Sequence, residues 1–358
     1  MPEVPAELAA RAGLLRELSR EGGPLSPDAP GATVRNPEWF RQVPGGGFVP
    51  RADRFELHRR LLAQFYQEHG RGDTGRQAVV LAGPPGAGKG VVRSRVLEEA
   101  GQRFTVVDPD EFKVLLVRAA VEDGSITAMM PPEAAGRGVR LAPMELAALV
   151  HEESSYLARR VRQAALARGE NVVVDGVMAN EVKAVRLASQ LARAGYDIQV
   201  VDVEVPAEVS RYRIVQRWVE QTYSSELGGR WVPSEFRELV FDTQDGAGSR
   251  SDRAARAVAE QVPEVSRYRR FFTTAEEARQ AVATPRLTDD LRRDDRGSQL
   301  RAAAPSPAST GSSVRSAVRA SYPQAATEAV RQPGRTAQQR TSSRPGRGYS
   351  SGPHGIGR

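Results

Sequence analysis

Residues 79–90, VVLAGPPGAGKG, constrain the fold of this chain more than any other stretch. A hydrophobic β-strand runs into a glycine-rich loop, and the helix-compatible residues 91–100 follow directly. In this context G-x-x-x-x-G-K predicts a phosphate-binding loop, because backbone N–H groups and the positive end of the new helix converge on an anion. Lys89 can neutralise the β- and γ-phosphates of a nucleotide such as ATP. The alternative is a Gly/Pro turn with an incidental lysine. The predicted nucleotide-binding residues are Gly83, Pro84, Pro85, Gly86, Ala87, Gly88, Lys89 and Gly90.

The loop departs from the usual motif at its last position. Gly90 replaces the Ser or Thr whose hydroxyl normally contacts Mg²⁺, and two valines follow it. No adjacent hydroxyl compensates, so the metal ligands are left unassigned. We expect Mg²⁺ to be held by the phosphates, by water, and by Asp108 or Asp175.

Short β-branched segments alternate with helical segments along the chain. The predicted strands cover residues 79–82, 104–108, 171–175 and 197–205, and the predicted helices cover residues 6–20, 51–69, 91–100, 144–168, 181–195, 206–223, 234–241 and 251–279. This alternation predicts an α/β fold of the P-loop NTPase type, with a mainly parallel sheet covered by helices on both faces. Ligands bind beyond the carboxyl ends of such strands. The loop 83–90, the acids 108–110 and Asp175 all fall at those ends.

Composition divides the chain into three predicted regions. An N-terminal extension, residues 1–50, is expected to be partly disordered, and residues 51–283 form the predicted catalytic domain. Residues 284–358 are rich in Arg, Ser, Pro and Ala, and we expect a disordered tail because few large apolar side chains are available to form a core. The net charge of +7 comes from the tail, since residues 1–300 hold 42 basic and 43 acidic residues. The tail either stays solvated or contacts nucleic acid or another acidic partner.

Several classes of protein are excluded by composition. The chain has no cysteine, so disulfides, thiol nucleophiles and Cys-ligated metals are ruled out. No run of eighteen apolar residues is present, and the first twenty residues lack the pattern of a signal peptide. We therefore expect a cytoplasmic protein that does not interact with membranes.

The segment VVDPDEFK, residues 106–113, supplies the candidate catalytic acids. Asp110 lies two residues beyond the strand and can accept a proton from an attacking hydroxyl. Asp108 closes the strand and can orient water on a metal ion. The alternative is that Asp110 and Glu111 merely favour the dipole at the start of the next helix.

An ordered set of motifs resembles the zeta-toxin family of P-loop kinases over roughly residues 55–275. The set comprises AGPPGAGKG, VVDPDEFK, HEESS at 151–155, NVVVDG at 171–176 and a pair of arginines. The resemblance implies that Asp110 is the catalytic base and that Lys113 lies beside the substrate. It also implies that Arg217 and Arg230 act from a lid on the transferring phosphoryl group, as two guanidinium forks can. The predicted catalytic residues are therefore Asp110, Lys89, Arg217 and Arg230, and Lys113 is a predicted substrate-binding residue.

The resemblance further implies ATP and Mg²⁺ as cofactors and UDP-N-acetylglucosamine as the phosphate acceptor. The implied acceptor-binding acids are Glu153, with Glu152 as the close alternative, and Asp175. The family's acid-Gly-Thr is Asp175-Gly176-Val177 here, so one expected hydroxyl is missing. The alternatives are a kinase for a nucleotide, an antibiotic or a dinucleotide, and a degenerate protein that binds ATP without turnover. An antitoxin protein is a possible partner.

Overall fold

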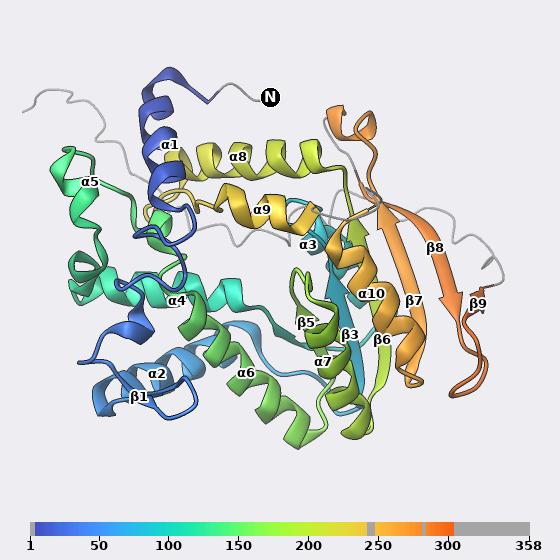
Figure 1. The fold of residues 1–358 in the computed structure, drawn as a ribbon. Coiled ribbons are helices and arrows are strands. Elements are labelled where there is room, and N and C mark those ends of the chain that lie inside the picture. The colour runs from blue at the N-terminus through green and yellow to red at the C-terminus, as the bar shows by residue number, and fades with distance from the viewer. Residues whose placement is uncertain (1–3, 242–247, 281–283, 304–358) are drawn as a thin grey trace, which may run out of the picture. The chain divides into compact units, whose positions relative to one another are not determined.

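A seven-stranded sheet lies at the centre of the described part of the chain, in the order β4-β5-β3-β6-β7-β8-β9 (Figure 1). The strands from β4 to β7 pair in parallel, whereas β8 and β9 extend the sheet in antiparallel fashion. The computed structural model describes residues 4–241, 248–280 and 284–303, which all lie within the unit Met1–Ser321. The strands are β1 (Phe40–Val43), β2 (Gly47–Pro50), β3 (Gln77–Ala82), β4 (Thr105–Val107), β5 (Val172–Asp175), β6 (Asp197–Glu204), β7 (Val265–Phe272), β8 (Arg286–Arg292) and β9 (Arg301–Ala302).

Helices cover both faces of the sheet. The α-helices are α1 (Ala6–Leu18), α2 (Ala52–His69), α3 (Lys89–Ala100), α4 (Pro109–Glu122), α5 (Pro132–Gly136), α6 (His151–Arg168), α7 (Glu181–Arg193), α8 (Ala207–Ser224), α9 (Ser234–Phe241) and α10 (Arg250–Gln261). The short 3₁₀ helices are η1 (Thr33–Arg35), η2 (Ser125–Met129), η3 (Pro143–Leu146) and η4 (Glu277–Arg279). Among the described residues, no helix has the length and apolar character needed to span a membrane.

The central strand β3 shows why both faces are covered. Ala78 and Val80 share a core cluster with α7 and α10, whereas Val79 and Leu81 pack with α3 on the opposite face. Side chains alternate between the faces of a strand, so a continuous apolar run needs helices on both sides. Figure 1 shows α7 and α10 in front of the sheet and α3 behind it. The expected α/β fold with a mainly parallel sheet is confirmed.

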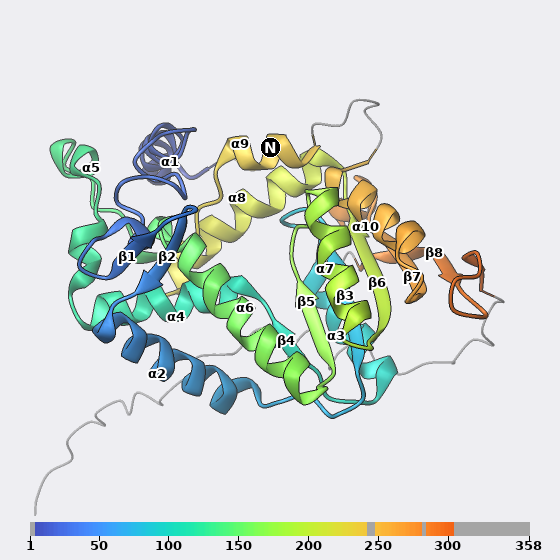
Figure 2. The same cartoon turned by 60° about the horizontal axis from the view of Figure 1, so that its bottom comes forward.

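The parallel register brings the polar strand ends together. Leu81 of β3 pairs with Asp175 of β5, and Val107 of β4 pairs with Val174. Asp108 directly follows Val107, and Gly83 directly follows β3. The phosphate-binding loop and both aspartates therefore lie at one edge, with α4 and α6 beside it (Figure 2).

The predicted helix over residues 144–168 is interrupted. Helix η3 ends at Leu146, and α6 begins only at His151. The carbonyl of Leu149 in the break accepts a hydrogen bond from the backbone N–H of Thr33, at 2.9 Å. A contact distant in sequence thus supports a break that helical periodicity did not reveal.

The C-terminal part of the predicted helix over residues 251–279 is wrong, because residues 265–272 form strand β7. The strand was not predicted because its sequence, VSRYRRFF, contains three arginines and does not read as an apolar run. Acids far away in the sequence pair with these arginines. Arg267 donates to Asp290 from Nε and Nη2, and Arg269 donates to Glu99 at 2.6 Å.

The predicted disorder from residue 284 onward is also wrong for β8 and β9. Strand β8 pairs with the edge of β7, and the ion pair between Arg267 and Asp290 joins the two strands. Polar strands of this kind are stabilised by cross-strand pairs rather than by a hydrophobic core. The rest of the predicted tail, residues 304–358, lies outside the described residues.

The N-terminal extension is ordered in its described part, residues 4–50, where partial disorder was expected. Leu15 and Leu25 are buried in the same core cluster as α4 and α6. A series of short backbone hydrogen bonds shapes the Pro/Gly-rich segment, as between the Ser26 N–H and the Gly23 carbonyl at 2.9 Å. Proline and glycine here specify turns, and the apolar residues between the turns reach the core.

Candidate active site

The loop from Gly83 to Gly90 has the geometry of an anion-binding loop. Gly83 has a φ of +144°, and a Cβ atom there would lie 2.2 Å from the carbonyl oxygen of Val203. Gly88 caps α3 in the left-handed region, with a φ of +92°. Gly83 therefore allows the loop to approach the backbone of β6 closely, and Gly88 allows the turn into α3. This turn leaves backbone N–H groups exposed at the start of α3.

Lys89 lies over its own loop. Its Nζ donates hydrogen bonds to the carbonyl oxygens of Gly83 at 2.8 Å and Pro84 at 3.2 Å. The ammonium group is thus held on the concave side of the loop, where it can exchange these carbonyls for phosphate oxygens. The loop and its lysine are suited to binding the phosphates of a nucleoside triphosphate.

Asp108 and Asp175 form an acidic pair bridged by Arg93. The Arg93 Nη1 atom lies 3.0 Å from the Asp175 carboxylate and 3.7 Å from the Asp108 carboxylate. Burial, with the nearby charges of Asp175 and Asp110, raises the pKa of Asp108 to about 7. Burial likewise raises the pKa of Asp175, although Lys89 and Arg93 oppose the change. Neutralisation by a cation favours the ionised form of both groups.

Asp110 lies in the first turn of α4, where Asp108 caps the helix by accepting from the Asp110 N–H at 2.9 Å. Its carboxylate is held on both oxygens: Lys113 donates to Oδ1 at 3.0 Å, and Arg230 donates to Oδ2. Burial works against ionisation, but Arg230 and Lys113 outweigh it and hold the pKa of Asp110 well below its usual range. The carboxylate is therefore ionised at neutral pH, and 47% of the side chain remains exposed.

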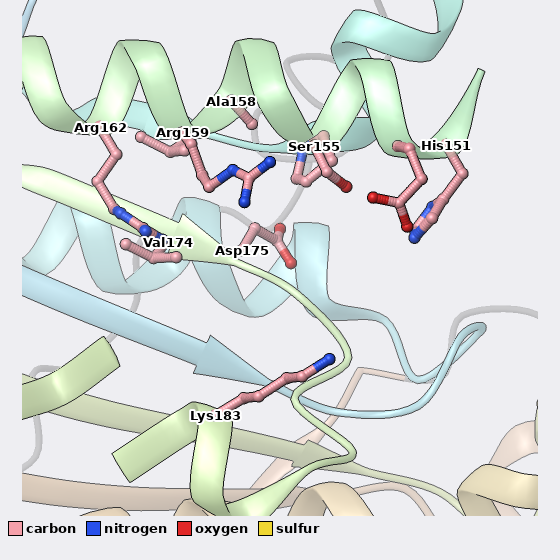
Figure 3. A pocket seen from close by; sticks show the side chains of 11 residues that line it. His151, Ser155, Ala158, Arg159, Arg162, Val174, Asp175 and Lys183 are labelled. Carbon is pink, nitrogen blue, oxygen red and sulfur yellow. The ribbon is translucent and has the colours of Figure 1, made fainter. Parts of the chain in front are cut away.

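A pocket of about 330 Å³ opens beside Asp175. Its lining residues are Val107, Pro109, His151, Glu152, Ser155, Ala158, Arg159, Arg162, Val174, Asp175 and Lys183. Figure 3 shows Arg159 and Arg162 reaching from α6, and Lys183 from α7, toward the space that Asp175 faces. Burial, together with Lys113, lowers the pKa of His151 to about 4, so this imidazole is neutral at physiological pH.

The structure separates the two candidate glutamates of HEESS. Glu152 lines the pocket, whereas Glu153 is fully buried between α6 and α2. Arg54 donates to both Glu153 oxygens, at 2.6 and 2.7 Å, and His58 Nε2 lies 2.6 Å from Oε1. Although burial alone raises the pKa of Glu153, the hydrogen bonds from His58 and Arg54 lower it to about 2. The preference for Glu153 as the acceptor-binding acid does not agree with this geometry, since its carboxylate is already enclosed by Arg54 and His58.

The remaining predicted residues lie on three elements. Lys113 is on α4 beside Asp110, Arg230 follows α8 and reaches Asp110, and the half-buried Arg217 is on α8 itself. Arg213 was not predicted; it lies one turn before Arg217 and donates to the Gly86 carbonyl at 3.2 Å.

Sequence reasoning also did not predict Arg93 or the three basic residues that line the pocket, Arg159, Arg162 and Lys183. Arg93 follows Lys89 by four residues on α3, and Arg159 follows Ser155 by four residues on α6. Residues four apart share a helix face. This spacing was the available signal, but it is common in a chain that carries 51 basic residues, of which only three are lysines.

Mg²⁺ has few candidate ligands in this site. Within residues 4–241, 248–280 and 284–303, no three His, Cys, Asp or Glu side chains are grouped to hold a metal. Asp108 and Asp175 are two carboxylates at the loop edge that lie against Arg93, whereas Asp110 at the same edge is held by Lys113 and Arg230. A metal carried in by the nucleotide phosphates would have Asp108 and Asp175 as its protein contacts.

Comparison with known proteins gives one family match. The family model described as zeta toxin matches residues 72–272, and no curated protein matches the chain in sequence. Similar solved structures include the complex of AvrRxo1-ORF1 and ORF2 with ATP (18% identity, 71% of this chain, 70% of that chain, TM-score 0.46). Another represents the PezAT chromosomal toxin–antitoxin system of Streptococcus pneumoniae (13% identity, 61% of this chain, 76% of that chain, TM-score 0.43). The matched segment runs from the residues just before β3 to the end of β7, which is more than half of the chain, and contains the glycine-rich loop, Asp110, Arg217 and Arg230; the chain belongs to the zeta toxin family.

Proposed function

We propose that this protein is an ATP-dependent kinase that phosphorylates a hydroxyl group of a sugar nucleotide resembling UDP-N-acetylglucosamine. The observation that carries the proposal is the placement of Asp110. Its carboxylate follows strand β4, at the same sheet edge as the phosphate-binding loop, and Lys113 and Arg230 hold it ionised. An ionised carboxylate at this edge can accept the proton of an attacking hydroxyl.

The charge of the pocket supports an anionic acceptor. Arg159, Arg162 and Lys183 line it, and the Asp175 carboxylate beside them is paired with Arg93. Burial and the neighbouring Arg159 lower the pKa of Arg162, so this cation gains from an anion at the pocket. A diphosphate suits such a cluster, because guanidinium groups bind phosphate oxygens with strong, charge-assisted hydrogen bonds. Glu152 and Asp175 remain to accept hydrogen bonds from sugar hydroxyl or amide groups.

Arg230 links nucleotide binding to the base in this proposal. When its guanidinium moves from Asp110 to the γ-phosphate, the Oδ2 atom is freed and the pKa of Asp110 rises. The carboxylate then becomes a better proton acceptor at the moment the phosphoryl donor is in place. Lys89 and the loop backbone hold the β- and γ-phosphates, and Arg217 adds a second cation from the lid. Bound Mg²⁺ would neutralise charge on the transferring group.

ATP turnover by the full-length protein tests the proposal. Turnover is measured with Mg²⁺, with and without UDP-N-acetylglucosamine, for the wild type, Asp110→Asn and the control Asp123→Asn at the exposed end of α4. We expect stimulation by the sugar nucleotide, lost by at least about a hundredfold in Asp110→Asn and retained in the control. Turnover without stimulation would redirect the search to another nucleotide, an antibiotic or a dinucleotide as acceptor. Binding of ATP without turnover would favour a degenerate nucleotide-binding protein, consistent with Gly90 and Val177.

A further inference from the structure

Each of the two lid arginines is followed by a buried tryptophan. Arg217 precedes Trp218 on α8, and Arg230 precedes Trp231 in the segment after it. The indole rings meet edge to face, with centroids 5.1 Å apart and an interplanar angle of 82°. Trp218 is fully buried, and Trp231 is 6% exposed. The backbone that carries each arginine is therefore fixed by an adjacent aromatic anchor.

The N-terminal extension holds both tryptophans. The Trp231 Nε1 atom donates to Ser19 Oγ, just after α1, at 3.1 Å. The Trp218 Nε1 atom donates to Glu145 Oε1 at 3.0 Å. Arg11 on α1 donates to Glu145 Oε2 from Nε at 3.0 Å and from Nη2 at 2.6 Å. Glu145 is only 1% exposed, so Arg11 supplies the cation that compensates its buried charge.

The segment between the two tryptophans has little freedom. A Cβ atom on Gly229 would lie 2.1 Å from the Trp218 carbonyl oxygen, so this backbone packs directly on α8. The Leu227 carbonyl accepts from the Met144 N–H at 2.9 Å, beside Glu145. Tyr223, near the end of α8, donates to Glu7 of α1 at 2.7 Å. Figure 1 shows α1 beside this end of α8.

We infer that α1, which lies outside the family-matched residues 72–272, positions the lid. The lid is here α8 together with the segment up to Trp231, which carry Arg217 and Arg230. In this role Arg11 and Ser19 are positioning residues. Arg11 acts through Glu145 and Trp218, and Ser19 acts through Trp231, so that Arg230 faces Asp110. The inference rests on the proposed function, which gives Arg230 its role at the transferring phosphate. The anchoring itself is a property of the fold and can be measured without activity.

Hydrogen exchange of the full-length protein tests the anchoring. The variant is Arg11→Met, which removes the cation from Glu145, and the control is Arg16→Gln, an exposed arginine on the same helix. We expect about ten-fold faster amide exchange in residues 225–232 of Arg11→Met, with unchanged exchange in β3 and β6 and no change in the control. Unchanged exchange in residues 225–232, or equal acceleration throughout the chain, would overturn the inference.

A double-mutant cycle then separates positioning from general stability. Arg11→Met is expected to lower kcat about ten-fold while the KM for ATP changes by less than about two-fold. In the background of Arg230→Gln the same change should cost less than about two-fold, because the group being positioned is gone. Equal losses in both backgrounds would show a merely structural effect and refute the positioning role.

Two gentler variants cover the case in which Arg11→Met does not fold. Ser19→Ala removes the hydrogen bond between these two residues and leaves both indole rings in place, whereas Trp231→Phe removes the same bond and keeps one aromatic ring against Trp218. Each should accelerate exchange in residues 225–232 in the same way, and the absence of this effect would overturn the inference. If the wild type shows no turnover, the proposed function fails, and the exchange measurement still decides whether α1 anchors the lid.

Discussion

Replacing Glu153 by glutamine tests which of the two adjacent glutamates serves the fold and which serves the site. The substitution keeps the size of the side chain and removes its charge. Arg54, itself only 6% exposed, then loses its carboxylate partner in a buried position. Because His58 also contacts Glu153, one substitution disturbs the whole link between α2 and α6.

The expected loss of stability follows from the pKa of Glu153. It lies at about 2 in the folded protein, compared with an ordinary value of 4.5. This difference corresponds to about 3 kcal/mol of stability at neutral pH. Removing one partner of a buried ion pair costs about 3 to 5 kcal/mol, and the value obtained from the pKa lies at the lower end of this range.

The sign of the pH dependence is determined by the lowered pKa. The contribution is fully present above the unfolded value of 4.5 and is lost as the pH falls toward 2. About 1 kcal/mol of it should be gone at pH 4. The stability gap between wild type and Glu153→Gln should therefore narrow as the solution becomes acidic.

Urea unfolding at pH 7 and pH 4 measures both quantities. The matched control is Glu152→Gln, one residue away on α6 with its side chain at the pocket, where we expect a change within about 0.5 kcal/mol. A gap below about 1 kcal/mol for Glu153→Gln at pH 7 would refute the buried-network reasoning. So would a gap that widens at pH 4.

Three further substitutions address the loop and the pocket. Lys89→Ala should weaken binding of a fluorescent ATP analogue at least about ten-fold, and unchanged affinity would contradict its role at the phosphates. Gly83→Ala should lower stability by more than about 3 kcal/mol in thermal unfolding, because its Cβ would clash with the Val203 carbonyl; Gly13→Ala, with open space around it, is the control. Arg159→Gln should raise the KM of the acceptor about ten-fold and leave the KM of ATP within two-fold, whereas the reverse pattern would place Arg159 at the nucleotide.

The local sequence pattern was sufficient to predict most strands of the sheet and the position of the glycine-rich loop. The strands β3, β4, β5 and β6 were predicted to within two residues, because buried parallel strands are short apolar runs bounded by turns. The glycine-rich loop and Asp110 were predicted from local pattern as well, since the motif that contains each of them is continuous in sequence. Strand β7 was missed because its arginines are neutralised by Glu99 and Asp290, which are far away in the chain.

The sequence by itself therefore determined the α/β class, the strand, glycine-rich loop and helix around Lys89, and the edge of the sheet where the acids gather. Only the tertiary structure showed that Glu153 is buried against Arg54 while Glu152 lines the pocket, because neighbouring residues on a helix point about 100° apart and the packing of α2 selects which one is buried. It likewise showed that Arg11 of α1 contacts Glu145, the hydrogen-bond partner of Trp218, and that Ser19 contacts Trp231. These contacts of Arg11 and Ser19 join residues more than a hundred positions apart, and no local pattern records which distant partner a buried side chain will meet.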